Sequence, residues 1–337
     1  MTGTNSRVSV IIPAYNAENS LVACIDSVLG QTLKPYEVLV VNDGSSDRTG
    51  AIAMGYGDKI VYIEQENQGQ GAARNRGLDQ ASGEFIAFLD ADDYWLKDFL
   101  QRCTDFLREH KEIAAVSTAL VIKYADGKEK IMPPCMQGQG KVEQPIILDN
   151  FFRFWAEQDH VRTGSNVIRK SIIDEAGNQR ADLRISQDLE YWGYIATFGK
   201  WGFIPEPLWV GCSRAAAIAP GWLKKYQQRR RLCPTVEAWE KRIVPRLKDY
   251  ERSGFEIVRG RVAASYAHNK ILAGDREEAF DIVRKHGATM PHNNLTSLMG
   301  MGARSGGFGW SIVCIIIKLK ERIKAWKLRL RIGVVNE

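Results

Sequence analysis

Glu84-Phe-Ile-Ala-Phe-Leu-Asp-Ala-Asp-Asp93 is the stretch that decides the fold of this chain. Its mostly apolar first six residues predict a buried strand, and three carboxylates follow within the next four residues. Since Mg2+ is usually held by one or two carboxylates together with substrate phosphates, this turn predicts a metal–diphosphate site. Helix capping is the alternative, in which Asp92 or Asp93 accepts backbone N–H groups of a helix beginning near Tyr94.

Two earlier strands are also expected to end in polar turns. Residues 8–12 are apolar and β-branched, and they stop at Pro13-Ala-Tyr-Asn16, where a proline without an N–H ends the ladder. Residues 36–41 run into Asn42-Asp43-Gly-Ser-Ser-Asp47. Both turns therefore place polar groups directly after a buried strand.

Helical patterns separate these strands. Leu21, Ile25 and Val28 recur at helical spacing after Asn19, which predicts a helix with Asn19 as its N-cap. A strand at 59–63 precedes a second helix at 69–79. This β-α-β-α-β-α-β order predicts an α/β domain with a mostly parallel central sheet.

In open sheets of this kind, ligands bind beyond the carboxyl ends of the strands. All three polar turns are expected at those ends, although they are far apart in the sequence. We therefore expect them to converge on one crevice, which helix capping alone would not explain.

Four segments, in this order, resemble the motifs of glycosyltransferase family 2: Val10-Ile-Ile-Pro-Ala-Tyr-Asn16, Val41-Asn-Asp-Gly-Ser-Ser-Asp47, Gly71-Ala-Ala-Arg-Asn-Arg-Gly77 and Phe88-Leu-Asp-Ala-Asp-Asp93. The resemblance covers residues 6–100. It implies the GT-A fold, a nucleotide-binding α/β domain that transfers a sugar from a nucleotide donor with inversion at the anomeric carbon.

The resemblance also implies how the donor is bound. It assigns Asp43 to the nucleobase, Asp90 to the ribose and Asp92 to a divalent metal, Mn2+ or Mg2+. Arg74 matches an arginine that members of the family place near the nucleotide. A planar guanidinium can hydrogen-bond to base edges and to phosphates. An ordinary turn for Asp43 and a solvated helix charge for Arg74 are the alternatives. The remaining donor contacts are Pro13, Tyr15 and Arg214, the last facing the diphosphate or serving as a surface ion-pair partner.

Transfer to a hydroxyl also needs a general base within hydrogen-bond reach of the attacking oxygen. Asp188 lies roughly where the family carries a Glu-Asp pair, and the resemblance makes it the base. Gln187 departs from the pattern, because it replaces the usual Glu with a neutral amide. If the family's Glu-Asp pair aligns two residues later in this sequence, Glu190 is the base instead. An ordinary helix with a buried aromatic face is the alternative for this segment.

Length and charge extend the prediction beyond one domain. The 337 residues allow a GT-A domain at 1–220, a helical extension at 221–300 and a basic amphipathic tail at 301–337. Six scattered cysteines and an N-terminus without a signal-like apolar core predict a cytoplasmic protein. The net charge of +6 suits an anionic partner but comes with no nucleic-acid reader motif, so nucleic acid is not expected.

The tail is expected to form an amphipathic helix. Lys318 to Arg331 contains seven basic residues and one acid, and no window reaches the ~20 apolar residues of a membrane span. The pattern favours a helix at the inner face of the cell membrane, with Trp310, Ile316 and Trp326 toward the acyl chains. A helix docked on the protein is the alternative.

The polar turns and the family resemblance together predict a metal-dependent inverting glycosyltransferase that uses a nucleotide-diphosphate sugar. The resemblance implies uridine as the base. The expected acceptor is a glycan or lipid-linked hydroxyl in surface polysaccharide synthesis. A nucleotidyltransferase is one rival, although no Gly-x-x-x-x-Gly-Lys loop occurs. A non-catalytic, membrane-tethered binding partner is the other.

Overall fold

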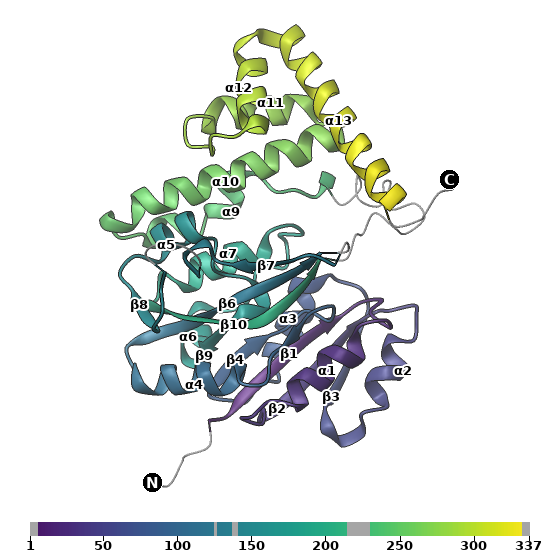
Figure 1. Cartoon of the computed structure of the whole chain (residues 1–337), viewed down its shortest axis with the longest axis vertical. Helices are drawn as coiled ribbons and strands as arrows, with labels where there is room; N and C mark the ends of the chain where they lie inside the picture. Colours follow the sequence, from purple (N-terminus) through teal and green to yellow (C-terminus); the bar gives the residue numbers. More distant parts are fainter. Residues whose placement is uncertain (1–5, 125–126, 137–140, 214–229, 332–337) are drawn as a thin grey trace. The chain divides into compact units, whose positions relative to one another are not determined.

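The computed structural model describes residues 6–124, 127–136, 141–213 and 230–331. The chain divides into two compact units. The first comprises residues up to Asp182 together with Gln187–Ser213, and the second comprises Leu183–Ser186 and the chain from Arg214 onward. Figure 1 follows the chain through both units. Arg214, expected at the donor diphosphate, lies outside the described residues.

The first unit is built on a ten-stranded mixed sheet whose main path runs β3-β2-β1-β4-β9-β6-β10-β5. Strands β3, β2, β1 and β4 are neighbours and parallel, while β9 runs antiparallel between β4 and β6. The predicted, mostly parallel α/β sheet is therefore confirmed. The strands are β1 (Val8–Ala14), β2 (Glu37–Asp43), β3 (Val61–Gln65), β4 (Phe85–Phe88), β5 (Tyr94–Trp95), β6 (Ile113–Tyr124), β7 (Glu129–Met132), β8 (Ile146–Leu148), β9 (Asn166–Arg169) and β10 (Lys200–Ser213).

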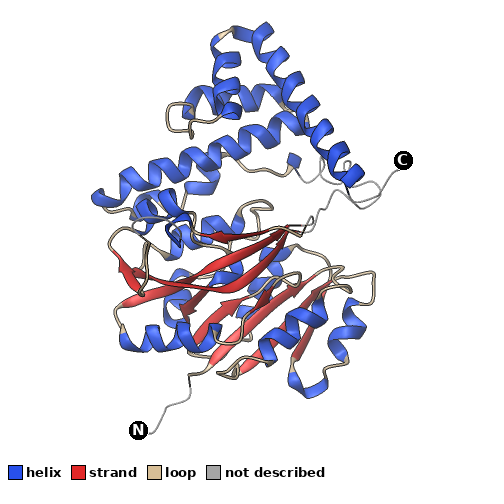
Figure 2. Cartoon of the chain, in the orientation of Figure 1, coloured by secondary structure: helices blue, strands red, loops and turns tan. Residues whose placement is uncertain are grey.

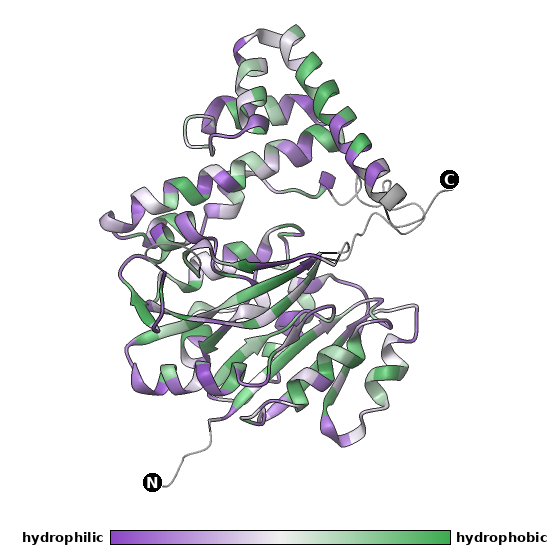
Figure 3. Cartoon of the chain, viewed as in Figure 1, coloured by the Kyte–Doolittle hydropathy of each residue, from purple (hydrophilic) through white to green (hydrophobic). Residues whose placement is uncertain are grey.

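Helices cover both faces of this sheet (Figure 2). Alternate residues of a strand point to opposite faces, so Val10 and Ile12 pack into the core beneath α1, α2 and α4, while Ile11 faces α3. Phe88 packs against Trp192 of α7 on that second face, with ring centroids 5.8 Å apart. Figure 3 shows the strands as mostly hydrophobic, as expected for a sheet buried on both sides. The helices of this unit are α1 (Leu21–Leu29), α2 (Thr49–Met54), α3 (Gln70–Leu78), α4 (Phe99–Glu109), α5 (Phe151–Gln158), α6 (Lys170–Ala176) and α7 (Gln187–Ile195).

Two predicted boundaries differ from the structure. Pro13 lies inside β1 and pairs with Val41 of β2, whereas the ladder was expected to end before it. The backbone of Ile11 hydrogen-bonds toward β4, and the backbone of Pro13, two residues later, faces the same side. Because β4 has already ended at Phe88, the missing N–H of Pro13 leaves no ladder hydrogen bond unmade. The N-cap of α1 is Ser20, whose side chain makes no capping hydrogen bond, and not Asn19.

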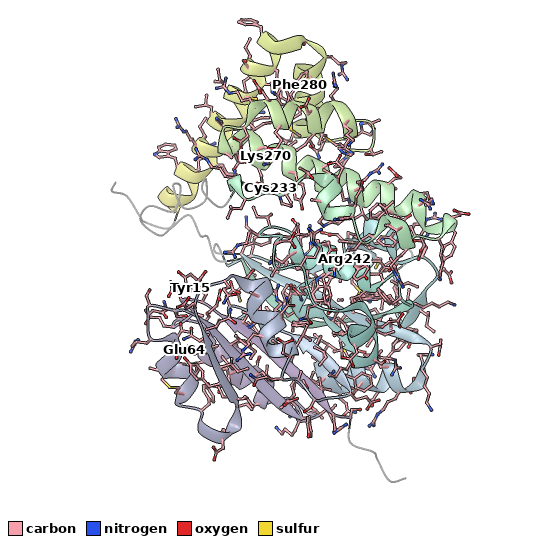
Figure 4. All side chains as sticks on the ribbon, turned by 180° about the vertical axis from the view of Figure 1, so that it is seen from behind. Tyr15, Glu64, Cys233, Arg242, Lys270 and Phe280 are labelled. Carbon is pink, nitrogen blue, oxygen red and sulfur yellow. The ribbon has the colours of Figure 1, made fainter. Side chains whose placement is uncertain are left out.

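The described residues of the second unit are mostly helical, which confirms the predicted C-terminal helical extension. Gly274 ends the long helix α10 in a left-handed conformation (φ 104°), at the turn between α10 and α11. Lys270 of α10 forms a 2.7 Å ion pair with Glu278 of α11, and both Lys270 and Phe280 are labelled in Figure 4. The helices are α9 (Val236–Glu240), α10 (Asp249–Ala273), α11 (Arg276–His286), α12 (Asn294–Arg304) and α13 (Gly306–Arg331).

The tail forms the predicted helix, α13, but not with the predicted orientation. Trp310 was expected to face acyl chains, yet it is 4% exposed, donates from Nε1 to the Arg276 carbonyl and packs against Phe280. Ile316 is half-buried, and only Trp326 of the three residues is exposed. Among the helices that the structure describes, none combines the length and the apolar character needed to cross a membrane.

Candidate functional site

Asp43, the last residue of β2, has a buried carboxylate that organises the loop before α3. Its Oδ1 accepts hydrogen bonds from Gln65 Nε2 (2.7 Å) and from the Gln68 backbone N–H (2.8 Å). Its Oδ2 accepts from the Gly69 N–H (2.8 Å). The carboxylate thereby fixes the beginning of α3 against the carboxyl end of the sheet. Its role toward a nucleobase stays a prediction.

The loops after β1 and β2 are joined side by side. The N–H of Ala17 donates to Thr49 Oγ1 (2.7 Å), and the N–H of Glu18 donates to Asp47 Oδ2 (3.1 Å). Burial would raise the pKa of Asp47, but hydrogen bonds from Thr49 and Glu18 outweigh it and lower the pKa overall. Sequence reasoning missed this role of Asp47, although Asp two residues before Thr is a typical local hydrogen-bonding signal.

Tyr15 lies in the first of these joined loops. Its side chain is 53% exposed, and Figure 4 labels it. Pro13, two residues earlier, is buried in β1. The predicted contact of Tyr15 with a nucleobase therefore requires no displacement of core residues.

Arg74 on α3 and Asp90 after β4 form an ion pair, with Nη2 and Oδ1 2.6 Å apart. The Arg74 side chain is 1% exposed, so a solvated helix charge, the alternative left open by the sequence, is wrong. Its Nε and Nη1 atoms are buried without a hydrogen-bond partner. Asp90 keeps 24% of its side chain exposed and can still meet a ligand.

The acidic turn after β4 does not cap a helix. Tyr94 and Trp95 form β5, which pairs antiparallel with Val210 and Trp209 of β10, and the next helix begins only at Phe99. The capping alternative is therefore wrong.

Asp92 and Asp93 have different surroundings within this turn. Asp92 is exposed, whereas Asp93 is 9% exposed and accepts a 2.8 Å hydrogen bond from the Cys212 backbone N–H. Within the described part of the chain, no three or more His, Cys, Asp or Glu side chains cluster as a complete metal site. A site with one exposed carboxylate still fits an ion whose other ligands are phosphates and water.

Asp188 lies in the first turn of α7 and is half-buried. Thr163 Oγ1 is 3.5 Å from its Oδ2. Burial would lower the pKa of Arg162, but the hydrogen-bonded Asp159 and the charge of Asp188 raise it overall. Glu190, the fallback base, is 0% exposed. Of the two carboxylates, only that of Asp188 is accessible to an acceptor.

Gln187 begins α7 and packs against the beginning of α3. Its side chain is 6% exposed, and a Cβ at Gly71 would lie 3.5 Å from its Cγ. Gly71 follows Gly69, the donor to Asp43, by two residues. This packing brings the N-terminal turn of α7, and with it Asp188, next to the loop that Asp43 organises.

The segment 162–165 links the same turn of α7 to β5 and β10. Trp95 Nε1 donates to the Gly164 carbonyl (2.6 Å), and a Cβ at Gly164 would lie 2.1 Å from Trp209 Nε1. Only a glycine permits that approach. Since Thr163 also reaches Asp188, the acidic turn, the end of β10 and α7 are held together. The expected convergence of distant polar turns is present.

Comparison with known proteins identifies the family of this chain. The sequence profile described as glycosyl transferase family 2 matches residues 9–177, half of the chain. The chain belongs to glycosyl transferase family 2. Glycosyltransferase GlyA of Streptococcus pneumoniae serotype 4 is 39% identical over 126 residues, which are 36% of this chain and 18% of GlyA. The uncharacterized glycosyltransferase EpsJ of Bacillus subtilis is 37% identical over 145 residues, 42% of each protein. The chain thus covers less than half of either relative.

Solved structures match over nearly the whole chain. S. aureus TarS 1-349 in complex with UDP is 16% identical with a TM-score of 0.58, covering 94% of this chain and 92% of that one. The same protein in complex with UDP-GlcNAc is 17% identical with a TM-score of 0.59 over the same shares. At these identities the likeness concerns the fold, which is of the GT-A type, as predicted.

Proposed function

We propose that this family 2 member is an inverting glycosyltransferase that moves a sugar from a nucleotide-diphosphate donor, a UDP-sugar, to a hydroxyl group of an acceptor. One observation carries the proposal. The neighbouring parallel strands β2, β1 and β4 end side by side, so Asp43, Tyr15 and the acidic turn share one edge of the sheet with Asp188 of α7. That edge is where open α/β sheets bind ligands.

The donor would lie along the ends of these strands. Tyr15 would lie against the base, with Asp43 holding the loop behind it, and Asp90 would accept from the ribose. Arg74 holds Asp90 in place, and the 24% of the Asp90 side chain that stays exposed supports a contact with the ribose hydroxyls. UDP and UDP-GlcNAc in the solved TarS complexes support a uridine donor.

Asp92 is the residue we assign to a divalent ion, Mn2+ or Mg2+, bound jointly with the donor diphosphate. When bound, such an ion neutralises the charge that gathers on the leaving diphosphate. The chain's own part is to hold the carboxylate at this place: Asp93 fixes the turn to β10 by its hydrogen bond from Cys212, and Asp92 stays exposed beside it. Arg74 holds Asp90 in the same turn.

Asp188 would remove the proton from the attacking hydroxyl. Its partial exposure allows an acceptor to approach, Thr163 Oγ1 lies 3.5 Å from its Oδ2, and the charge of Arg162 acts on it electrostatically. Inversion follows when the hydroxyl attacks the anomeric carbon opposite the leaving diphosphate. We propose a glycan or lipid-linked acceptor in surface polysaccharide synthesis and a site of action at the cytoplasmic face of the cell membrane.

A donor screen tests the proposal. The protein is incubated with Mn2+ or Mg2+, nucleotide sugars and acceptor glycans, and the released nucleotide is identified. Nucleoside diphosphate is expected, and Asp92→Asn should lose the metal-dependent release while Asp58→Asn, an exposed acid away from the strand ends, keeps it. Release of pyrophosphate would make the protein a nucleotidyltransferase. Nucleotide binding without release of any nucleotide product from any donor would identify the protein as a non-catalytic binding partner.

A further inference from the structure

Helix α13 has two apolar faces, and the residues that the structure describes cover only one of them. Trp310, Val313, Cys314 and Ile317 are buried among the helices of the second unit. A Cβ at Gly302 of α12 would lie 2.7 Å from Val313 Cγ2, so α12 and α13 pack closely on this side. The opposite side carries six exposed apolar residues, with exposed fractions between 43% and 83%. They are Phe308, Ile312, Ile315, Leu319, Ile323 and Trp326.

These six residues, which we call the outer stripe, form one continuous line. At about 100° per residue they fall within an arc of about 80°, centred roughly opposite the buried face. The stripe spans 19 of the helix's 26 residues and carries an aromatic side chain at each end. Six large apolar side chains in one row on a surface helix indicate a binding surface.

Basic residues border the outer stripe on both sides. By helical spacing, Lys318 and Arg322 flank one edge, and Lys320 and Lys327 flank the other, each within about 100° of the centre. Glu321 points away from the stripe, toward the buried side, where it lies 3.8 Å from His268. The stripe therefore presents apolar side chains between two rows of positive charge.

We propose that the outer stripe of α13 inserts into the surface of an anionic lipid bilayer. Apolar side chains of an interfacial helix enter about 5–10 Å, and each flanking lysine or arginine is attracted to anionic headgroups. A second copy of this chain fits less well, because pairing two stripes would bring four or more like charges of each copy together. This inference goes beyond the transfer reaction and needs no donor to test.

Vesicle flotation of the full chain tests it. We expect the protein to float with phosphatidylcholine vesicles containing 30 mol% phosphatidylglycerol, to float much less with pure phosphatidylcholine, and to be released as salt rises. The double variant Ile315→Glu and Leu319→Glu should reduce the bound fraction at least about tenfold, since two charges replace inserted side chains. The matched control, Tyr250→Glu and Ile257→Glu, makes the same charge change at residues of α10 with similar exposure, 55% and 46%.

A second variant distinguishes loss of membrane binding from misfolding of the first variant. Lys320→Gln with Lys327→Gln leaves the apolar residues in place, so it should keep the helical content and lose the preference for anionic vesicles. Equal flotation of the Ile315/Leu319 variant and its control would overturn the proposal, as would no flotation of the unaltered protein. Self-association that the same substitutions abolish, without vesicle binding, would assign the stripe to a second copy of the chain.

Discussion

Arg74 and Asp90 are paired across the boundary between α3 and the end of β4, with a guanidinium that is almost fully buried and a carboxylate that remains partly exposed. One guanidinium nitrogen contacts Asp90 at 2.6 Å, while Nε and Nη1 have no partner. The pair thus combines two roles: it fixes the acidic turn to the helix, and it keeps a partly exposed Asp90 carboxylate next to the proposed nucleotide site.

Replacing Arg74 by methionine should destabilise the first unit by about 2–4 kcal/mol, because a buried ion pair is broken while Asp90 can partly rehydrate. Denaturant unfolding measures the change. Arg76→Met, two residues along the same helix at an exposed position, is the control and should stay within about 0.5 kcal/mol of the unaltered protein. Equal effects of the two variants would mean that the Arg74–Asp90 contact does not hold the turn.

Asp93→Ala should loosen the end of β10. The variant lacks the carboxylate that accepts from the Cys212 N–H. Because a hydrogen bond to a charged group contributes about 1.5–3 kcal/mol, amide exchange at residues 210–213 should accelerate at least about tenfold. Hydrogen–deuterium exchange with mass spectrometry measures it. Asp93→Asn keeps an acceptor oxygen and should restore most of the protection. Unchanged exchange in the alanine variant would contradict the assignment.

His160 should make the first unit sensitive to acid. Its ring lies among Phe151, Phe154 and Phe203, and neither ring nitrogen has a hydrogen-bond partner among the described residues. Burial, helped by the charge of Arg162, lowers the pKa of His160 to about 3. The unfolded chain takes up a proton near pH 6.5 and the folded chain does not, so stability is full above pH 6.5 and falls between pH 6.5 and about 3.

At pH 5 this difference amounts to about 2 kcal/mol. His160→Leu should remove that part of the pH dependence, because an apolar side chain of similar size suits the aromatic surroundings and carries no proton. Unfolding free energies from pH 5 to 8 measure the slope. His292→Leu, an exposed position of the second unit, is the control and should leave the slope unchanged. A slope that persists in His160→Leu would show that other groups cause it.

The sheet and the converging turns could be predicted because they depend on local pattern. Runs such as Val8–Ala14 and Phe85–Phe88 are apolar and short, and parallel alternation alone puts Asp43, Tyr15 and Asp92 at one edge. The hydrogen bond between Asp93 and Cys212 joins residues 119 positions apart and has no local signal.

The orientation of α13 could not be predicted from the sequence for a different reason. Its sequence has two apolar faces about 180° apart, so periodicity alone does not tell which one docks on α12 and which stays exposed. The structure decides that question through Gly302, whose missing side chain lets Val313 approach.

Asp188→Asn should separate binding from chemistry at the proposed base. The amide keeps the size of the side chain and its contact with Thr163, so UDP-sugar binding measured by calorimetry should be unchanged. Single-turnover transfer should slow by about 10²–10⁴-fold, because the amide cannot accept the proton of the attacking hydroxyl. Asp174→Asn, on the exposed face of α6, is the control and should transfer at the unaltered rate. Glu190→Gln lies at a fully buried position and should change stability more than the rate per folded molecule. If Asp188→Asn transfers normally while Glu190→Gln does not, the base is Glu190, and α7 must move to expose it.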